Sequence, residues 1–499
     1  MRVTNSMINK TSMKNMNTNK ISVDALNTQM TTQKKISRPS EDPVIAIRAL
    51  RLRSQLGEIN QYYEKNIPDA ESWLDLTSTA LENMKTIVTE VYKQCVNGAT
   101  DTLNEEDRDA ILQNLQALRV QIYKEGNADN AGRTIFTGFK TSSQLTFERD
   151  EPDTTYQITE KMTFEDIQEK RYYSNQVVLP TDEAGVQAGV DLDDMPDEIV
   201  NFRMRLSYGG LTGTDGSTTD IALKYKGANG QENTITATTR SYEQWAEDGF
   251  TVGEDETLFI PETGEIILGK NVSESLKGAK ADISVEYSKT GFNEGEIRPE
   301  HYFDCTNSTD KNNVIEYKKE NQEIAYTVSF NQTIVVNTQA SDVFDASIGR
   351  DIDELTDTVK AAIAAHDKVK KLEEMKEQEQ YASPEMQAKL DEWLQAARKE
   401  ATFMDDNMQK HYGKAVGDFQ GYLDTISLAA TDVGSKGDRL KLTKSRVSNQ
   451  QMAFEKLKST NEDRELSDII IDFTAAYTAY QASLMASSKA NQQTLLNYL

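Results

Sequence analysis

The 499-residue chain has few of the residues that build disulfide frameworks, metal centres or membrane spans. Two cysteines, Cys95 and Cys305, are too few for a disulfide framework, so we expect both to be free thiols. His301, His366 and His411 are far apart, none has metal-ligand spacing to a cysteine, and we expect all three at the surface. No run approaches the roughly 18–20 apolar residues of a membrane span. The composition therefore predicts no metal site and no membrane insertion.

Motifs of common catalytic and nucleotide-binding sites are missing as well. There is no G-x-x-x-x-G-K-[ST] phosphate-binding loop and no G-x-S-x-G nucleophile elbow. The amino terminus lacks the apolar segment of a secretory signal, so we do not expect a conventional signal peptide. The sequence indicates no catalytic residue and no cofactor.

Charge is plentiful but unevenly distributed. The formal net charge is −26, and residues 141–350 carry most of the excess acid. The only basic stretch, residues 1–40, is short and lacks aromatic residues. Because nucleic-acid binding needs an extended basic face, we do not expect a nucleic-acid partner. The acidic middle is typical of a solvated outer surface.

The stretch KKISRPSEDPVIAIRALRLRSQL, residues 34–56, combines a marked start with a helical pattern. Asp42 has the side chain to cap a first helical turn, and Pro43 suits the first helical position, where an N–H group is not needed. Residues before proline avoid the helical region, so Arg38 and Asp42 should be extended. We expect a hinge in front of the helix, made of Arg38, Pro39, Asp42 and Pro43.

Apolar residues then recur at alternating steps of four and three, the heptad pattern of a helix with a partner helix. The positions of this first seam are Ile45, Ala49, Leu52, Leu56, Ile59 and Tyr63. A matching seam near the other end, predicted to be a terminal assembly helix, consists of Leu466, Ile470, Phe473, Tyr477, Tyr480 and Leu484. We therefore expect the two ends of the chain to run antiparallel beside each other, with Pro68 interrupting or kinking the first helical stretch.

Two glycines leave the carboxy-terminal helical pattern open to two interpretations. The pattern runs from Pro384 to the end of the chain without another proline. Gly434 and Gly437 interrupt it, and each glycine costs about 1 kcal/mol relative to alanine inside a helix. They either end one helix at a turn, or lie in a continuous helix and let another helix approach closely.

The middle of the chain has a different pattern. Short β-branched and aromatic runs alternate with Gly, Asp and Asn, and the runs around GANGQ predict a β-hairpin. We therefore predict an α+β protein, with a long antiparallel helical rod built from both termini and one or two β-rich domains inserted in the middle.

This organisation divides the chain into five segments. Residues 1–40 are too poor in apolar positions for a stable isolated helix, and we expect them to be disordered until assembly orders them. The others are the two halves of the helical core at 41–140 and 351–465, the β-rich insert at 141–350 and the assembly helix at 466–499.

Several stretches together resemble the family of flagellar hook-filament junction proteins, also called hook-associated protein 3, which is related to flagellin. They are SRPSEDPVIAIRALRLRSQL, YYEKNIPDAESWLDLTSTALENM, LNEEDRDAILQNLQALR and GNADNAGRTIFTGFKT near the amino terminus, and DVGSKGDRLKLTKSRV and TAYQASLMASSKANQQTLLNYL near the carboxy terminus. Glu41 stands where an aspartate is common in the family, and the insert is larger than in a compact member.

The resemblance implies a structural protein without enzymatic activity. Such proteins leave the cell through the flagellar type III export apparatus, with a chaperone, and assemble outside it at the end of the hook. Expected partners are hook-associated protein 1 on the hook side, flagellin on the filament side and copies of the chain in a ring. Flagellin itself and a secreted adhesin or enzyme with a helical stalk remain the alternatives.

Overall fold

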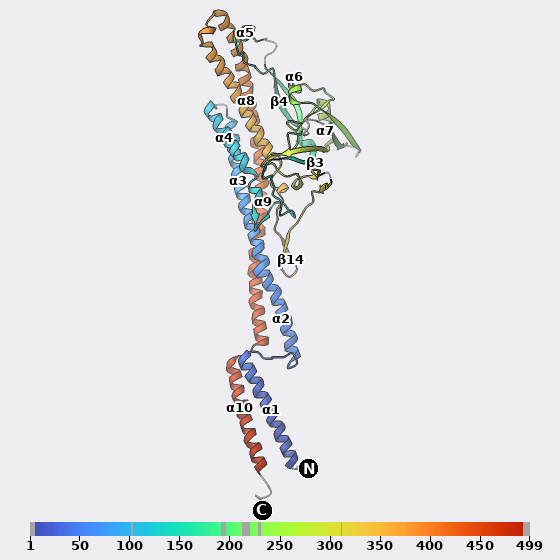
Figure 1. Ribbon diagram of the computed structural model, residues 1–499, viewed down its shortest axis with the longest axis vertical. Helices are drawn as coiled ribbons and strands as arrows, with labels where there is room; N and C mark the ends of the chain where they lie inside the picture. Colours follow the sequence, from blue (N-terminus) through green and yellow to red (C-terminus); the bar gives the residue numbers. More distant parts are fainter. Residues whose placement is uncertain are drawn as a thin grey trace, which may run out of the picture. The chain divides into compact units, whose positions relative to one another are not determined.

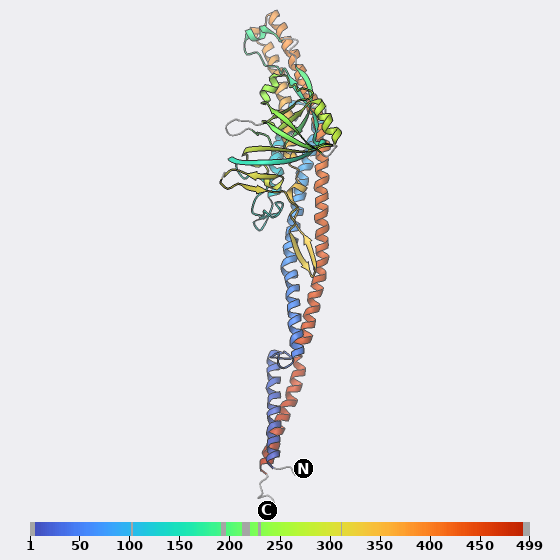
Figure 2. The same ribbon diagram turned by 90° about the vertical axis from the view of Figure 1, so that its right-hand side faces the viewer.

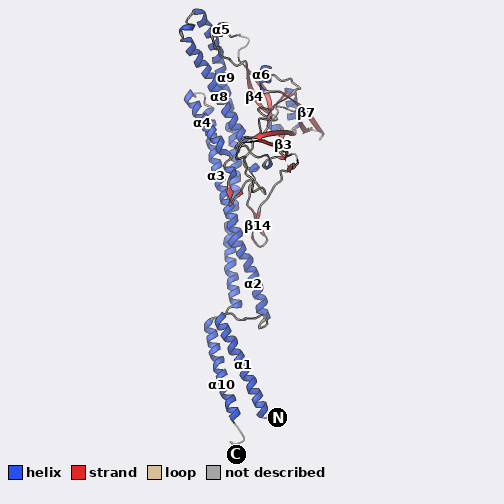
Figure 3. Ribbon diagram, in the orientation of Figure 1, coloured by secondary structure: helices blue, strands red, loops and turns tan. Residues whose placement is uncertain are grey.

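The computed structural model describes residues 5–100, 103–190, 196–211, 220–227, 231–310 and 312–492. Long helices and a central group of strands form an α+β protein (Figure 3), which confirms the predicted fold class. Internal contacts divide the chain into two compact units. The terminal unit comprises Met1–Glu71, Tyr326–Ile334 and Asp438–Leu499, and the central unit comprises Ser72–Ala325 and Val335–Gly437.

Helices make up most of the structure. In chain order they are α1 (Asn5–Thr32), α2 (Pro43–Gln61), α3 (Ile67–Gly98), α4 (Glu105–Ile122), α5 (Glu183–Ala188), α6 (Tyr242–Glu247), α7 (Lys270–Ala279), α8 (Ser347–Lys376), α9 (Pro384–Glu462) and α10 (Leu466–Gln492). The strands are β1 (Asp129–Asn130), β2 (Arg133–Thr134), β3 (Glu151–Thr163), β4 (Gln168–Ser174), β5 (Asp197–Arg205), β6 (Ile221–Lys226), β7 (Glu232–Thr239), β8 (Thr257–Ile260), β9 (Glu265–Leu268), β10 (Asp282–Phe292), β11 (Asp304–Asn307), β12 (Ile315–Tyr317), β13 (Ala325–Ser329) and β14 (Gln332–Val335).

In the terminal unit, segments from the two ends of the chain lie side by side. Helix α1 runs along α10 (Figures 1 and 2). Helix α2 lies beside the last part of α9, where Gln451 donates to Asn60 at 3.0 Å and Asn461 donates to the carbonyl of Ile45 at 3.2 Å. The two ends of the chain therefore lie side by side, as predicted, but the two seams do not pair with each other: α2 lies on α9, and α10 lies on α1.

Pro68 does not break the first helical stretch. A single π-helical turn, Tyr62–Asn66, joins α2 to α3, and the N–H of Ile67 bonds to the carbonyl of Tyr62. A π turn shifts the backbone hydrogen bonds of the helix by one residue. This shift is compatible with Pro68, which follows the turn and has no N–H to donate. The interruption is thus a local bulge.

The hairpin β13–β14 is held on helices of the terminal unit. Asn66 donates to the carbonyl of Thr327 at 2.7 Å, and Gln332 donates to Thr443 of α9 at 3.3 Å. Arg446 of α9 also bonds Gln332. This part of the sequence range expected to be the β-rich insert therefore packs within the terminal unit.

The central unit contains a ten-stranded sheet in the order β12-β11-β3-β10-β6-β7-β8-β9-β5-β4. Neighbouring strands run antiparallel except β7 and β8, which pair in parallel. The pairing of β6 with β7 confirms the hairpin predicted around GANGQ, whose residues 228–230 lie outside the described part. The aromatic side chains of Tyr172, Trp245 and Phe250 form an apolar cluster on this sheet.

Helices of the central unit pack on one another and on the sheet. Arg119 of α4 pairs with Asp353 of α8 at 2.8 Å, and the Tyr123 hydroxyl accepts the N–H of Gly349 at 3.1 Å. Where α3 ends, a Cβ added to Gly98 would lie 2.1 Å from the Tyr412 ring of α9, so only glycine allows this approach. Near the turn between α8 and α9, Val186 of α5 packs with Leu372, Leu390 and other apolar residues.

A buried ionic cluster joins the sheet to α8. Arg203 and Arg205 of β5 both donate to Glu354 of α8 at 2.7 Å. Glu265 of β9 accepts from Lys170 at 2.7 Å and also pairs with Arg203. Burial opposes the charge of Glu265, but the two cations outweigh it and lower its pKa to about 2.

Two expectations need correction. His301 is buried and His411 is mostly covered, so the surface assignment was wrong for them; burial lowers the pKa of His301 to about 3 and that of His411 to about 4. The last helical stretch does not run unbroken to the end, because residues 463–465 separate α9 from α10. Both cysteines are free, as expected, and both are buried. None of the described helices could cross a membrane.

Candidate functional site: the paired terminal helices and the hinge

Most of the segment predicted to order on assembly, residues 1–40, is occupied by helix α1. Asn5–Thr32 are helical, and the inner side of the pair contains Met16 and Val23 of α1 with Phe473 of α10, all only partly buried. Ile469 is the one fully buried apolar residue of either helix among those described. Because this pair buries so little apolar surface, its stability in the free chain is not ensured, and disorder before assembly stays a prediction.

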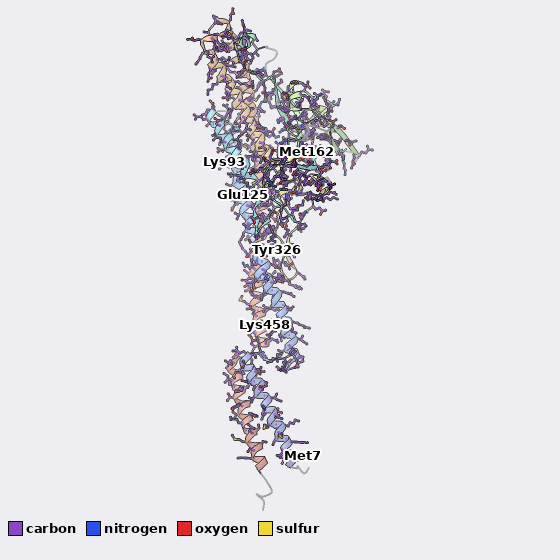
Figure 4. The ribbon with its side chains drawn as sticks, viewed as in Figure 1. Met7, Lys93, Glu125, Met162, Tyr326 and Lys458 are labelled. Carbon is purple, nitrogen blue, oxygen red and sulfur yellow. The ribbon has the colours of Figure 1, made fainter. Side chains whose placement is uncertain are left out.

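The α1–α10 pair leaves many large apolar side chains in water. On α1, Met7 (labelled in Figure 4) is 55% exposed and Ile21 is 70% exposed. On α10 the exposed group is Leu466, Ile470, Ile471, Tyr477, Leu484 and Met485. Clusters of this kind on a protein surface mark interaction sites.

The predicted assembly seam is therefore divided between two faces. Phe473 and Tyr480 are partly buried, whereas Leu466, Ile470, Tyr477 and Leu484 are exposed. A two-helix pair can cover only one side of a helix, and the spacing alone did not indicate which positions would remain free. The role of all six positions in assembly stays a prediction.

The hinge residues shape the connection between α1 and α2. Glu41 donates its N–H to the carbonyl of Arg38 at 3.0 Å, which closes a turn with Pro39 at its second position. Asp42 is extended (φ −147°, ψ 100°) and its Oδ1 accepts the N–H groups of Val44 and Ile45 at 2.9 and 3.1 Å. The local conformation of Asp42 and the place of Pro43 at the first helical position agree with the prediction.

A second connection, between α9 and α10, pairs with residues 33–35, which lie between the end of α1 and the hinge. Lys34 and Asp463 form an isolated antiparallel bridge. The N–H of Lys35 donates to the carbonyl of Glu462 at 2.7 Å, and the N–H of Arg464 donates to the carbonyl of Gln33 at 3.0 Å. Backbone N–H and C=O groups that have no helical partner, because α1 and α9 end here, thus form hydrogen bonds with each other.

An ionic clasp, made of Lys34, Arg53, Glu462 and Asp463, surrounds this bridge. Arg53 of α2 holds both carboxylate oxygens of Glu462, with distances of 2.8 and 2.6 Å. Glu462 is 4% exposed, and its pKa is lowered mainly by the hydrogen bond from Arg53. Lys34 bonds Asp463 and lowers its pKa in the same way. The clasp therefore links α2 and the end of α9 to the two connections, α1–α2 and α9–α10.

The remaining predicted residues lie on α2 and α9. Leu52 and Leu56 are buried, whereas Ile45 and Ile59 are partly buried. Gly434 and Gly437 lie inside α9, so the continuous-helix interpretation is the one that holds. A Cβ added at either glycine would meet no atom within 4 Å among the described residues, so no described segment packs closely there, and the close-packing role of the two glycines stays a prediction.

Some residues of the site were not found from the sequence. Ala46 and Ile469 are buried next to seam positions, because real helices turn slightly away from a strict heptad. Arg53 and Glu462 are 409 positions apart, so no local pattern indicated their pairing. A cluster of His, Cys, Asp or Glu that could hold a metal is not found in the described ranges.

Residues 3–141 match the family model described as the bacterial flagellin N-terminal helical region. The chain is 29% identical over 144 residues to flagellar hook-associated protein 3 of Salmonella typhimurium, covering 29% of this chain and 45% of that protein. It is 32% identical over 116 residues to the protein of the same name from Escherichia coli, covering 23% and 36%. The chain thus spans less than half the length of each of these two relatives.

Solved structures with similar chains include a flagellar hook-associated protein from Vibrio parahaemolyticus, with 14% identity, coverage of 85% and 100%, and a TM-score of 0.35. Another is hook-associated protein 3 from Legionella pneumophila, with 12% identity, coverage of 81% and 98%, and a TM-score of 0.22. TM-scores this low do not establish a shared fold. On the sequence matches, the amino-terminal part of the chain is similar to the flagellin N-terminal helical region and to flagellar hook-associated protein 3.

Proposed function

We propose that this chain is a structural, non-enzymatic component of the bacterial flagellum that joins the hook to the flagellin filament. The observation that supports this most is the apolar surface left open on α1 and α10, seen for example at Ile21 and Leu484. In an assembly, neighbouring molecules would cover this surface. Covering it would offset the cost of ordering the termini, about 1–2 kcal/mol per residue.

The partners follow from this role. Hook-associated protein 1 would bind on the hook side, flagellin on the filament side, and copies of the chain would form a ring. The type III export apparatus and a chaperone would bring the chain to its extracellular site. Residues 1–40 and 466–499 would carry assembly, while the acidic 141–350 segment would face the medium.

Deletion of the gene in its host tests the proposal. Cells should make hooks without filaments and release flagellin into the medium, and a plasmid copy should restore filaments. Normal filaments in the deletion strain would contradict a junction role.

A filament subunit is the second candidate, because the matching family model is that of flagellin. Purified protein that elongates into filaments by itself would support this candidate over the junction role.

A further inference from the structure

Helix α2 has a second apolar face, opposite the one that packs on α9. Val44, Ile47 and Leu50 are 75%, 54% and 65% exposed, whereas Ala49 and Leu52 on the inner face are buried. Steps of three place the exposed residues on one side of the helix. Single exposed aliphatic residues are ordinary, but three within seven positions form a cluster that needs an explanation.

This outer face is also basic. Arg48 and Arg51 are exposed beside the three aliphatic residues, and neither forms an ion pair within the described part of the chain. The chain as a whole has a formal net charge of −26. A surface that is both basic and apolar fits a partner that is acidic and apolar.

The first half of α3 has such a face. Asp69, Asp75, Leu76 and Glu82 are exposed. Steps of seven residues place Asp69 above Leu76 and Asp75 above Glu82, so the four side chains form two neighbouring stripes on the helix surface. The three acids form no ion pair with any described residue. Apart from Lys85, the exposed side of this stretch has no basic residue to neutralise it.

We infer that the outer face of α2, made of Val44, Ile47, Arg48, Leu50 and Arg51, binds the acidic face of α3 in a second copy of the chain. The contact joins two different surfaces, so each copy can bind two neighbours, and repetition builds a ring or a helical array. This inference rests on the proposed function and names the surface by which copies meet.

Cross-linking in assembling flagella tests the contact. A photoreactive amino acid is placed at position 47, and flagella are isolated after irradiation. The expected product has twice the chain's mass and joins position 47 to the tryptic peptide 66–85. An adduct to flagellin or to another hook-associated protein would overturn the inference, and so would flagella that contain the chain without any adduct.

Charge reversal provides the matched control. The Arg48→Glu/Arg51→Glu variant should lose at least tenfold in dimer yield, and adding Asp75→Arg/Glu82→Arg should restore most of it. All four positions are exposed, so the thermal unfolding temperature should stay unchanged. A dimer yield in the fourfold variant that is no higher than in the Arg48→Glu/Arg51→Glu variant would contradict the pairing. Flagella that lack the chain altogether would instead overturn the proposed function, and this inference with it.

Discussion

Glu462 is the most buried residue of the ionic clasp. It is the last residue of α9, is almost completely buried, and accepts two hydrogen bonds from Arg53 while its carbonyl accepts the N–H of Lys35. Arg53 is half-exposed, so solvent weakens the attraction, but a buried carboxylate needs its partner. We therefore expect stability to depend more on the carboxylate of Glu462 than on the guanidinium of Arg53.

We expect Glu462→Gln to destabilise the terminal unit by about 1–3 kcal/mol, because a neutral amide cannot hold the guanidinium in the same way. Urea unfolding followed by circular dichroism measures this change. Glu455→Gln, at an exposed position on the same helix, should have no measurable effect. Equal effects of the two substitutions would show that the clasp contributes nothing.

Leu52 and Leu484 both belong to predicted seams but have opposite surroundings. Leu52 is buried between α2 and α9, whereas Leu484 is 41% exposed on α10. Leu52→Asp should cost at least about 3 kcal/mol of stability. Leu484→Asp should leave the melting temperature unchanged and abolish filament attachment. Melting curves and a swimming assay separate the two, and equal destabilisation would contradict the division into prefolded and assembly-dependent helices.

At the scale of elements, α1 and α10 differ from the other long helices because they bury almost nothing. Only Ile469 is fully buried among the described residues of the pair, whereas α8 alone buries ten residues. Helices of this length are held mainly by tertiary packing rather than by their own propensity. The pair is therefore the part of the terminal unit that should open most easily.

Limited proteolysis of the free protein should remove both termini and leave a core near residues 41–465. Mass spectrometry of the products identifies the cuts. The same termini should resist cleavage in isolated flagella, where neighbouring molecules cover them. Termini that resist protease in the free monomer would show that the α1–α10 pair is stable alone.

The sheet and α8 are joined by buried charges, so their attachment should weaken in acid. As pH falls from 6.5 toward 4, the unfolded chain binds protons at His411 and His301, while burial keeps both neutral in the native state. Below about pH 4.5 the unfolded chain also protonates Glu265, whose native pKa is about 2. Both effects lower stability as pH decreases.

All three tryptophans, Trp73, Trp245 and Trp393, lie in the central unit, so their fluorescence reports its unfolding. The urea midpoint should fall steadily from pH 6.5 to pH 4. The His301→Gln/His411→Gln variant should show a smaller decrease over that interval. If the urea midpoint of this variant falls as much as that of the unchanged protein, the two buried histidines do not cause the loss of stability.

Local signals predicted the elements near the hinge well. The cap at Asp42, the first position at Pro43 and the beginning of α10 at Leu466 follow from capping chemistry and periodicity. Contacts between distant positions could not be predicted this way. The pairing of Arg203 with Glu354 spans 151 residues, and neither β5 nor α8 shows a local pattern that demands it.

At the scale of the whole molecule, the chain contains surfaces with different tasks. The central unit has its own aromatic and ionic core, while the terminal unit exposes apolar faces on α1, α10 and α2. The sequence predicted helical termini and a β-rich middle. It did not predict that β13–β14 would pack in the terminal unit, because hairpin patterns specify local pairing and not the surface that receives the hairpin.

The central claim is that this chain joins the hook to the filament, and its position in isolated flagella tests that claim most directly. An epitope tag in the 212–219 stretch, labelled with gold and viewed by electron microscopy, reports this position. The account predicts one narrow band of label between hook and filament on each flagellum. Label along the whole filament, or no label at the junction, would contradict it.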